Sequence, residues 1–291
     1  MVNKYCTINK NCEITLEANP GTLDDSKLKG FNEAGINRLS IGAQSFNNEH
    51  LQAIGRIHNK TQVINSIKTA LELNFNSINI DLMFGLPQQN QQQALSDLQQ
   101  AINFNVHHIS WYELTIEPNT LFAKRPPTRV DSDTRAEWTY QGHQLLKQFN
   151  HYEVSAFAKP GFECQHNSWI WSFGDYLGIG AGAHSKITNN KQVNRYVKQR
   201  HPRQYMANKN KIIQTQLVTD KELAFEYLLN RLRLKMPISW DAAKKQANLT
   251  LNSQAMQSAI KQKFINHDQD FFYLTKTGQW FLDDVVFVDL K

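Results

Sequence analysis

The sequence predicts an α/β protein: an incomplete parallel β/α barrel of the TIM type, followed by a small helical, winged-helix-like C-terminal domain. Two observations favour this fold class. Over roughly the first 120 residues, short β-rich runs alternate with amphipathic helical segments, which is typical of parallel βαβ units. Toward the end of the chain, helical segments are followed by a small β-like ribbon, as in a winged helix.

Four runs have the alternating or apolar pattern of strands. They are Cys12–Ala18, Arg38–Ala43, Ile78–Phe84 and His108–Ile116. The helices that we expect between and after these strands cover residues 24–34, 61–73, 91–104 and 131–149. Thr22 stands where the first helix needs an N-cap, and Gly35 stands where that helix should stop. Because a helix joins each strand to the next, we expect the strands to be parallel.

The pattern changes in the second half of the chain. Tyr152–Ala158 has a strand-like composition, and an aromatic and glycine-rich segment follows at Cys164–Ser185. A helical pattern then dominates to near the C-terminus. We therefore place a domain boundary near residue 210, with the partial barrel in residues 1–210 and the winged-helix-like domain in residues 211–291.

Composition excludes several kinds of protein. The 291-residue chain has 32 Lys and Arg and 26 Asp and Glu, giving a formal net charge of +6, and the two signs are interleaved. No basic run stands out, so nucleic-acid binding is not favoured. No apolar stretch approaches the roughly 20 residues that a membrane-spanning helix needs. The three cysteines form no disulfide framework, which favours the reducing cytoplasm.

Polar residues stand at or near the ends of the predicted strands, where parallel β/α proteins bind their ligands. Glu17 and Gln44 end the first and second strands, Asp81 lies in the third, and Arg56 follows the second. Carboxylates accept hydrogen bonds from hydroxyl or ammonium groups, and arginine pairs with a carboxylate. The set could therefore bind a zwitterionic nucleoside. The alternative is that each residue only caps a neighbouring backbone group.

Several longer motifs follow one another along the chain. They are Glu17–Gly21, Arg38–Phe46, Gly55–His58, Asn79–Pro87, Trp111–Thr115, Glu117–Thr120, Glu153–Ala158, His166–Asn167 and Phe173–His184. In order and spacing they resemble the haem chaperones (HemW type) of the radical S-adenosylmethionine superfamily, which are related to oxygen-independent coproporphyrinogen III oxidases. The resemblance is dense over residues 12–205 and loose in the C-terminal domain. It implies a barrel of the radical S-adenosylmethionine kind.

The resemblance implies an S-adenosylmethionine site lined by Glu17, Gln44, Arg56 and Asp81. Arg56 would bind the methionyl carboxylate, and the two acidic residues would bind hydroxyl or ammonium groups. Thr115 and the backbone of residues 178–182 would approach the adenosine, since glycine lets the backbone come close.

A second motif, His166-Asn167-Ser-Trp-Ile-Trp, resembles the His-Asn-x-x-Tyr-Trp motif that the family ties to haem binding. By resemblance, His166 would ligate the haem iron and the tryptophans would cover the porphyrin. Lys159 and Lys186 are candidate partners of the propionates. Ile170 replaces the tyrosine, so one hydroxyl is missing. The alternative is that His166 is a loop histidine bonded to backbone and that the tryptophans belong to the core.

The sequence departs from the family at the iron–sulfur cluster. Family members bind a [4Fe–4S] cluster through a Cys-x3-Cys-x2-Cys loop, whereas here Cys6 and Cys12 lie six positions apart and Cys164 stands alone. By resemblance, the chain starts at about the third strand of the family's barrel. We therefore expect no cluster ligands in this chain, and no radical catalysis by this chain alone.

The function that these observations favour is haem binding and haem delivery, with haem and a haem-accepting protein as partners. One alternative is an enzyme of porphyrin biosynthesis, an oxygen-independent coproporphyrinogen III oxidase. Another is a non-catalytic remnant, or a nucleic-acid binder that uses the basic C-terminal end. The His166-Asn167 segment favours the chaperone branch, and the sequence leaves open whether the chain is an enzyme.

Overall fold

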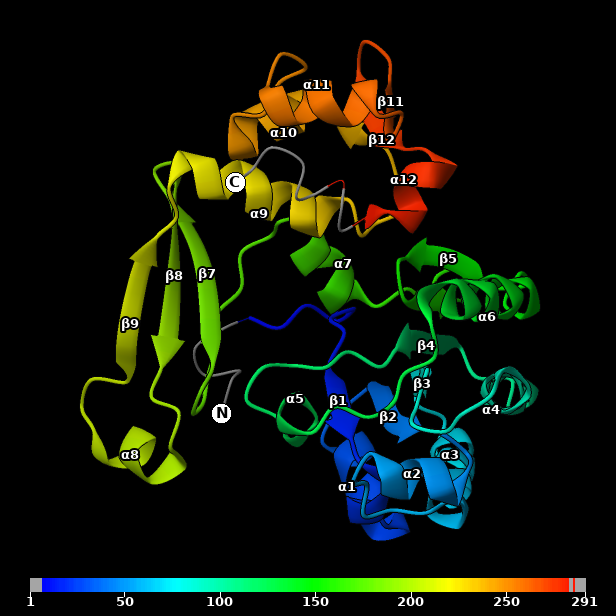
Figure 1. Ribbon diagram of the computed structural model, residues 1–291. Coiled ribbons are helices and arrows are strands. Elements are labelled where there is room, and N and C mark those ends of the chain that lie inside the picture. The colour runs from blue at the N-terminus through cyan, green and yellow to red at the C-terminus, as the bar shows by residue number, and fades with distance from the viewer. Residues whose placement is uncertain (1–6, 283–284, 286–291) are drawn as a thin grey trace. The chain divides into compact units, whose positions relative to one another are not determined.

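The computed structural model describes residues 7–282 and 285 (Figure 1). The chain forms two compact units that divide between Glu163 and Cys164. The first unit holds a six-stranded sheet, and the second holds two three-stranded antiparallel sheets. Within residues 7–282, no helix combines the length and the apolar character that are needed to cross a membrane.

The sheet of the first unit has four parallel strands and an antiparallel hairpin at one edge. Its strands are β1 (Thr15–Ala18), β2 (Arg38–Gln44), β3 (Ser77–Phe84), β4 (His108–Glu113), β5 (Asn150–Glu153) and β6 (Ala156–Ala158). The order is β1-β2-β3-β4-β6-β5, and β6 is antiparallel to both β4 and β5. The predicted α/β class with parallel strands is confirmed, and the described strands form an open sheet. The strand-like run Tyr152–Ala158 is a hairpin, because the chain turns between Glu153 and Ala156.

Helices connect these strands. They are η2 (Pro20–Thr22), α1 (Asp25–Glu33), α2 (Asn48–Ala53), α3 (Lys60–Glu72), α4 (Gln91–Asn103), α5 (Leu121–Lys124) and α6 (Ser132–Leu145). Asn59 and Asn90 each form a capping box with the glutamine three residues later, which sets the starts of α3 and α4. The predicted N-cap of the first helix is wrong. Asp24 caps α1 by accepting from the Lys27 amide, and Thr22 lies in η2.

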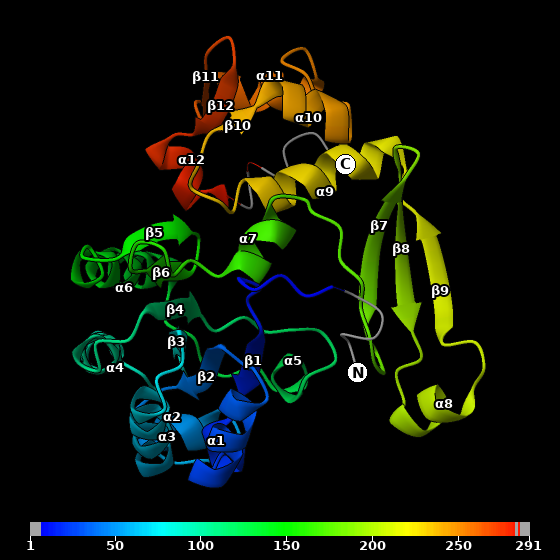
Figure 2. The same ribbon diagram turned by 180° about the vertical axis from the view of Figure 1, so that it is seen from behind.

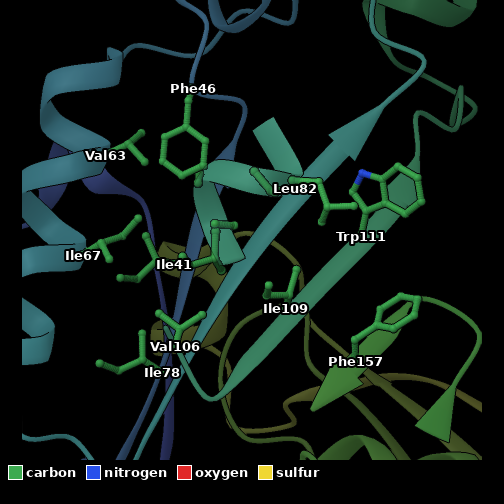
Figure 3. Close-up of a cluster of buried hydrophobic side chains, with 14 of the residues drawn as sticks. Ile41, Phe46, Val63, Ile67, Ile78, Leu82, Val106, Ile109, Trp111 and Phe157 are labelled. Carbon is green, nitrogen blue, oxygen red and sulfur yellow. The ribbon is translucent and has the colours of Figure 1, made fainter. Parts of the chain in front are cut away.

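The face of the sheet that the helices cover is apolar. Alternate residues of the central strands are buried there: Leu39, Ile41, Ala43, Ile78, Ile80, Leu82, Phe84, Ile109 and Trp111. Figure 3 shows Ile41 and Ile78 on the side of Val63 and Ile67, which belong to α3. Burying such a side chain contributes about 1.5–3 kcal/mol. A shift of register by one residue would expose the whole set, so this layer fixes how the strands pair.

The opposite face of the same strands is polar. Side chains alternate along a strand, so the residues between the buried apolar ones point to this second face. They are Ser40, Gln44, Asn79, Asp81, His108, Ser110 and Tyr112. We call these residues the polar face of the sheet. It is the part of the fold that positions the candidate site.

The second unit begins with α7 (Gln165–Trp171) and a three-stranded sheet. Its strands are β7 (His184–Asn189), β8 (Gln192–Lys198) and β9 (Ile212–Leu217), with α8 (Pro202–Ala207) before the last strand. They are antiparallel in the order β7-β8-β9, so the stretch after residue 211 starts as a strand where a helical pattern was expected. A cut at residue 210 would separate β9 from its partner β8, and a domain boundary at that position stays a prediction.

The C-terminal region has the element order of a winged helix. It contains α9 (Asp220–Arg231), β10 (Ile238–Ser239), α10 (Trp240–Ala247), α11 (Gln254–Lys261), β11 (Ile265–His267), β12 (Phe271–Leu274) and α12 (Lys276–Trp280). Its strands form an antiparallel sheet in the order β10-β12-β11, beside α10 and α11 (Figure 2). Tyr227, Met256 and Phe272 are fully buried in one hydrophobic cluster. The predicted helical, winged-helix-like region is confirmed.

Candidate functional site

Strand register places polar side chains in a row across the polar face. Glu17 of β1 pairs with Ser40 of β2, Ser40 pairs with Asn79 of β3, and Asn79 pairs with His108 of β4. Neighbouring strands lie about 4.8 Å apart, so the side chains of one row can reach one another. Asp81 follows Asn79 by two residues and therefore points to the same face.

Asp81 is fixed by two neighbours. Ser40 Oγ donates a hydrogen bond to Asp81 Oδ2 at 3.0 Å, and Asn79 Nδ2 donates to Asp81 Oδ1 at 2.8 Å. Asn79 Nδ2 also donates to Ser40 Oγ at 2.8 Å, so the three side chains form a closed triangle. An ionised carboxylate offers about four acceptor positions. Asp81 therefore keeps acceptor capacity for the hydroxyl or ammonium groups of a ligand.

A neutral histidine orients this triangle. His108 is buried, and its burial, helped by the charge of Arg38, lowers its pKa to about 3. His108 Nδ1 lies 2.6 Å from Asn79 Oδ1, and an amide oxygen can only accept, so Nδ1 carries the proton. The unprotonated Nε2 then accepts from the Tyr152 hydroxyl at 2.8 Å. This chain turns the Asn79 amide so that its NH₂ group faces Asp81.

Gln44 has a strained backbone that its neighbours hold in place. Its φ of 66° lies in the left-handed region, and β2 bulges between Ile41 and Gln44. A non-glycine residue in this region costs on the order of 1–2 kcal/mol. Asp97 of α4 locks the following turn, accepting from Ser45 Oγ at 2.5 Å and from the Phe46 amide at 2.9 Å. These bonds offset the strain and hold Gln44 on the polar face.

Tyr112 lies at the centre of the four predicted ligand residues. Its hydroxyl donates to Gln44 Oε1 at 3.1 Å. Burial is the largest cause that raises the pKa of Tyr112 to about 12, the charges of Asp81 and Glu17 add to it, and the charge of Arg56 opposes it. Charges act strongly on a phenol only at short range. The shift therefore places the predicted side chains around one hydroxyl.

Arg56 and Asn19 border the same space as Gln44. Arg56 Nη1 donates to Asn19 Oδ1 at 2.8 Å. A Cβ at Gly42 would lie 3.0 Å from Gln44 Nε2, 3.6 Å from Asn19 Oδ1 and 3.7 Å from the Ala18 carbonyl oxygen. Gly42 thus leaves an open floor between the two amides. Arg56 is half-buried, and its guanidinium is suited to a bidentate pair with a carboxylate.

Thr115 is not brought into this group by its own contacts. It is exposed, and its Oγ1 approaches only the Glu113 carbonyl, at 3.5 Å. The Glu113 carboxylate itself binds Arg135 at 2.7 Å and also binds Arg129. The expected contact of Thr115 with adenosine stays a prediction, as does that of the backbone of residues 178–182 in the second unit.

The described cysteines do not fit an iron–sulfur cluster. Cys12 is exposed and Cys164 is buried, both as free thiols, while Cys6 lies outside the described residues. In the part of the chain that the structure covers, no three His, Cys, Asp or Glu side chains gather as a metal site. Whether the chain takes up a cluster stays a prediction.

His166 lies on α7 at an exposed position, so it is a helical residue rather than a loop histidine. Trp169 follows one turn later and is 59% exposed, so it does not belong to the core. Its indole is nevertheless fixed, because Nε1 donates to the Asp175 carbonyl at 2.7 Å. Gly174 lies against the ring, where a Cβ would approach within 2.3 Å. An exposed imidazole and a fixed, exposed indole therefore lie one turn apart on α7.

The two lysines considered as propionate partners serve the fold instead. Lys186 is buried, and its Nζ donates to Asp175 Oδ1 and to the Phe173 carbonyl at 2.9 Å each. Lys159 Nζ donates to the carbonyl and to the side-chain oxygen of Asn105, at 2.8 and 2.7 Å. The assignment of these ammonium groups to propionates is therefore wrong.

Known proteins share this arrangement of motifs. The family model described as the Radical SAM superfamily matches residues 1–101. Heme chaperone HemW of Haemophilus influenzae is 41% identical, over 98% of this chain and 76% of the relative. The chain belongs to the HemW family of radical S-adenosylmethionine proteins. Heme chaperone HemW of Escherichia coli is 43% identical, over 95% of this chain and 74% of the relative. The family resemblance drawn from the motifs is confirmed.

A solved structure shares the fold of this HemW-family chain. Coproporphyrinogen III oxidase (HemN) from Escherichia coli, a radical SAM enzyme, matches with a TM-score of 0.80. The match covers 98% of this chain and 71% of that chain, at 19% identity. At this identity the likeness establishes the fold alone.

Proposed function

We propose that this chain is a haem-binding and haem-delivery protein that also binds S-adenosylmethionine on the polar face of its first sheet. The observation that carries the S-adenosylmethionine site is the grouping of Glu17, Gln44, Arg56 and Asp81 around Tyr112. The haem function is supported by the HemW relatives, which are named heme chaperones, and by the exposed surface of α7.

Each predicted side chain has a role in this proposal. The Arg56 guanidinium pairs with the methionyl carboxylate, while Asp81 and Glu17 accept from hydroxyl or ammonium groups. Gln44 adds an amide, and Gly42 leaves room beside it. S-adenosylmethionine supplies radical chemistry only together with a reduced iron–sulfur cluster. The residues of this chain bind and orient the ligand, and the proposed activity is delivery of haem rather than radical catalysis.

In the second unit, His166 supplies the imidazole that ligates the haem iron, and Trp169 covers part of the porphyrin. Delivery requires a haem-accepting protein as the partner. We propose the reducing cytoplasm as the compartment, because Cys12 and Cys164 are free thiols.

Haem titration tests the haem part of the proposal. Wild-type protein should bind haem saturably with a shifted Soret band, and His166→Ala should change both the band position and the affinity. His184→Ala is the matched control, because His184 is likewise exposed in the second unit, and it should change neither. Ile170→Tyr should tighten binding by restoring the family's hydroxyl. A His166→Ala variant that binds haem as the wild type does would remove the haem site from α7.

Oxidation of coproporphyrinogen remains the alternative function, and no described feature favours it over haem delivery. The solved oxidase structure shares 19% identity, so it supports the fold and not the reaction. Its sequence likeness is also lower than that of the HemW relatives, at 41% and 43%.

A further inference from the structure

Gln44 presents an unusual amide on the polar face. The residue is only 4% exposed, and its Oε1 is occupied by the Tyr112 hydroxyl at 3.1 Å. Within the described residues, its Nε2 has no protein acceptor. A buried amide N–H without an acceptor is costly. Such a group at the floor formed by Gly42 indicates that an acceptor from outside the protein completes it.

The direction of the Tyr112–Gln44 bond decides what Gln44 can offer. The pKa of Tyr112 is raised to about 12, so its phenol keeps its proton at neutral pH and can donate. The amide oxygen accepts that proton, which turns the NH₂ group toward Gly42, where Nε2 would lie 3.0 Å from an added Cβ. Asn19 holds Arg56 beside the same floor. Two donor groups therefore converge on one place.

We propose that Tyr112 is a positioning residue that fixes the Gln44 amide, so that the space over Gly42 accepts only a hydrogen-bond acceptor of the ligand. This inference rests on the proposed S-adenosylmethionine site and deepens it. The acceptor is an oxygen, either of the ribose or of the methionyl carboxylate. Tyr112 acts through Gln44 and forms no bond with the ligand. Its removal should therefore matter only while Gln44 is present.

A double-mutant cycle in the full chain tests this coupling. Tyr112→Phe should weaken S-adenosylmethionine binding about 10-fold in calorimetric titration, and the same change should have no further effect in a Gln44→Leu background. Gln44→Glu, which replaces the donor by an acceptor, should weaken binding more than Gln44→Leu does. Tyr140→Phe is the matched control, because Tyr140 is 49% exposed on α6, and it should bind as the wild type does. Independent, multiplying effects of Tyr112→Phe and Gln44→Leu would overturn the proposal, as would wild-type affinity of Gln44→Glu.

The acceptor is identified by a second ligand, 5′-methylthioadenosine, which has the ribose but lacks the amino-acid carboxylate. If Tyr112→Phe weakens the binding of both ligands, the acceptor is a ribose oxygen. If it weakens only S-adenosylmethionine, the acceptor is the carboxylate. Equal binding of both ligands by wild type and variant would overturn the proposal.

A readout without ligand separates this inference from the proposed function. The side-chain amide signals of Gln44 in a ¹⁵N spectrum are those that Gln44→Leu removes. Tyr112→Phe should shift them, and unshifted signals would overturn the positioning role of Tyr112. A wild-type chain that binds no S-adenosylmethionine at millimolar concentration would instead refute the proposed site, while the amide signals still report the Tyr112–Gln44 bond.

Discussion

Gly42→Ala should weaken S-adenosylmethionine binding without unfolding the first unit. The added Cβ would lie 3.0 Å from Gln44 Nε2 and 3.6 Å from Asn19 Oδ1. Both neighbours are the ends of side chains, which can move by the few tenths of an ångström needed. Mild crowding is further offset by the lower entropy of the unfolded chain, so the free energy of unfolding should change by at most about 1 kcal/mol. The displaced amide and the filled floor should reduce the affinity by about 10-fold or more.

Gly30→Ala is the matched control for this variant. Gly30 lies in α1, and nothing lies within 4 Å of the Cβ that alanine would add. Alanine is favoured over glycine inside a helix by about 1 kcal/mol, so this variant should be more stable and should bind as the wild type does. Calorimetric titration measures the affinity, and urea unfolding measures the stability. A Gly42→Ala protein with wild-type affinity would refute the placement of the ligand over Gly42.

Two further predictions concern Asp97 and the cysteines. Burial raises the pKa of Asp97, so the fold prefers the protonated carboxyl. The free energy of unfolding then falls as pH rises from about 4, the unfolded value, through the raised pKa. Asp97→Asn removes this titration and should gain stability relative to wild type between about pH 4 and pH 7 in urea unfolding; a constant difference would contradict the assignment. Anaerobic reconstitution with iron and sulfide should leave the chain without a [4Fe–4S] cluster, because its sequence lacks the three-cysteine motif. Near-stoichiometric iron and sulfide, with absorbance near about 400 nm, would show that cysteine argument to be wrong.

Periodicity and topology explain why part of the site could be predicted from sequence. The apolar alternation in β2 and β3 identifies strands whose second face must be polar. The carboxyl ends of parallel strands share one edge, so Glu17, Gln44 and Asp81 were expected near one another. The structure brings these three and Arg56 around a single phenol.

The remaining features depend on contacts that a single segment does not contain. The left-handed φ of Gln44 follows from a bulge against β3 and from the lock by Asp97, which is 53 residues later in the chain. Tyr112 was not identified as a site residue, although its spacing from His108 and Ser110 places it on the polar face of β4. The turn between β5 and β6 was missed because Tyr152–Ala158 has a continuous strand-like composition.

The central claim, that the polar face binds S-adenosylmethionine through Arg56, is tested most directly by calorimetric titration of three proteins. They are the wild type, Arg56→Ala, and Arg203→Ala, whose arginine is exposed on α8 in the second unit. We predict that wild type and Arg203→Ala bind alike and weakly, in the micromolar range or above. Arg56→Ala should bind at least about 10-fold more weakly, because the methionyl carboxylate loses its charged partner. Submicromolar affinity that Arg56→Ala leaves unchanged would contradict this placement of the site.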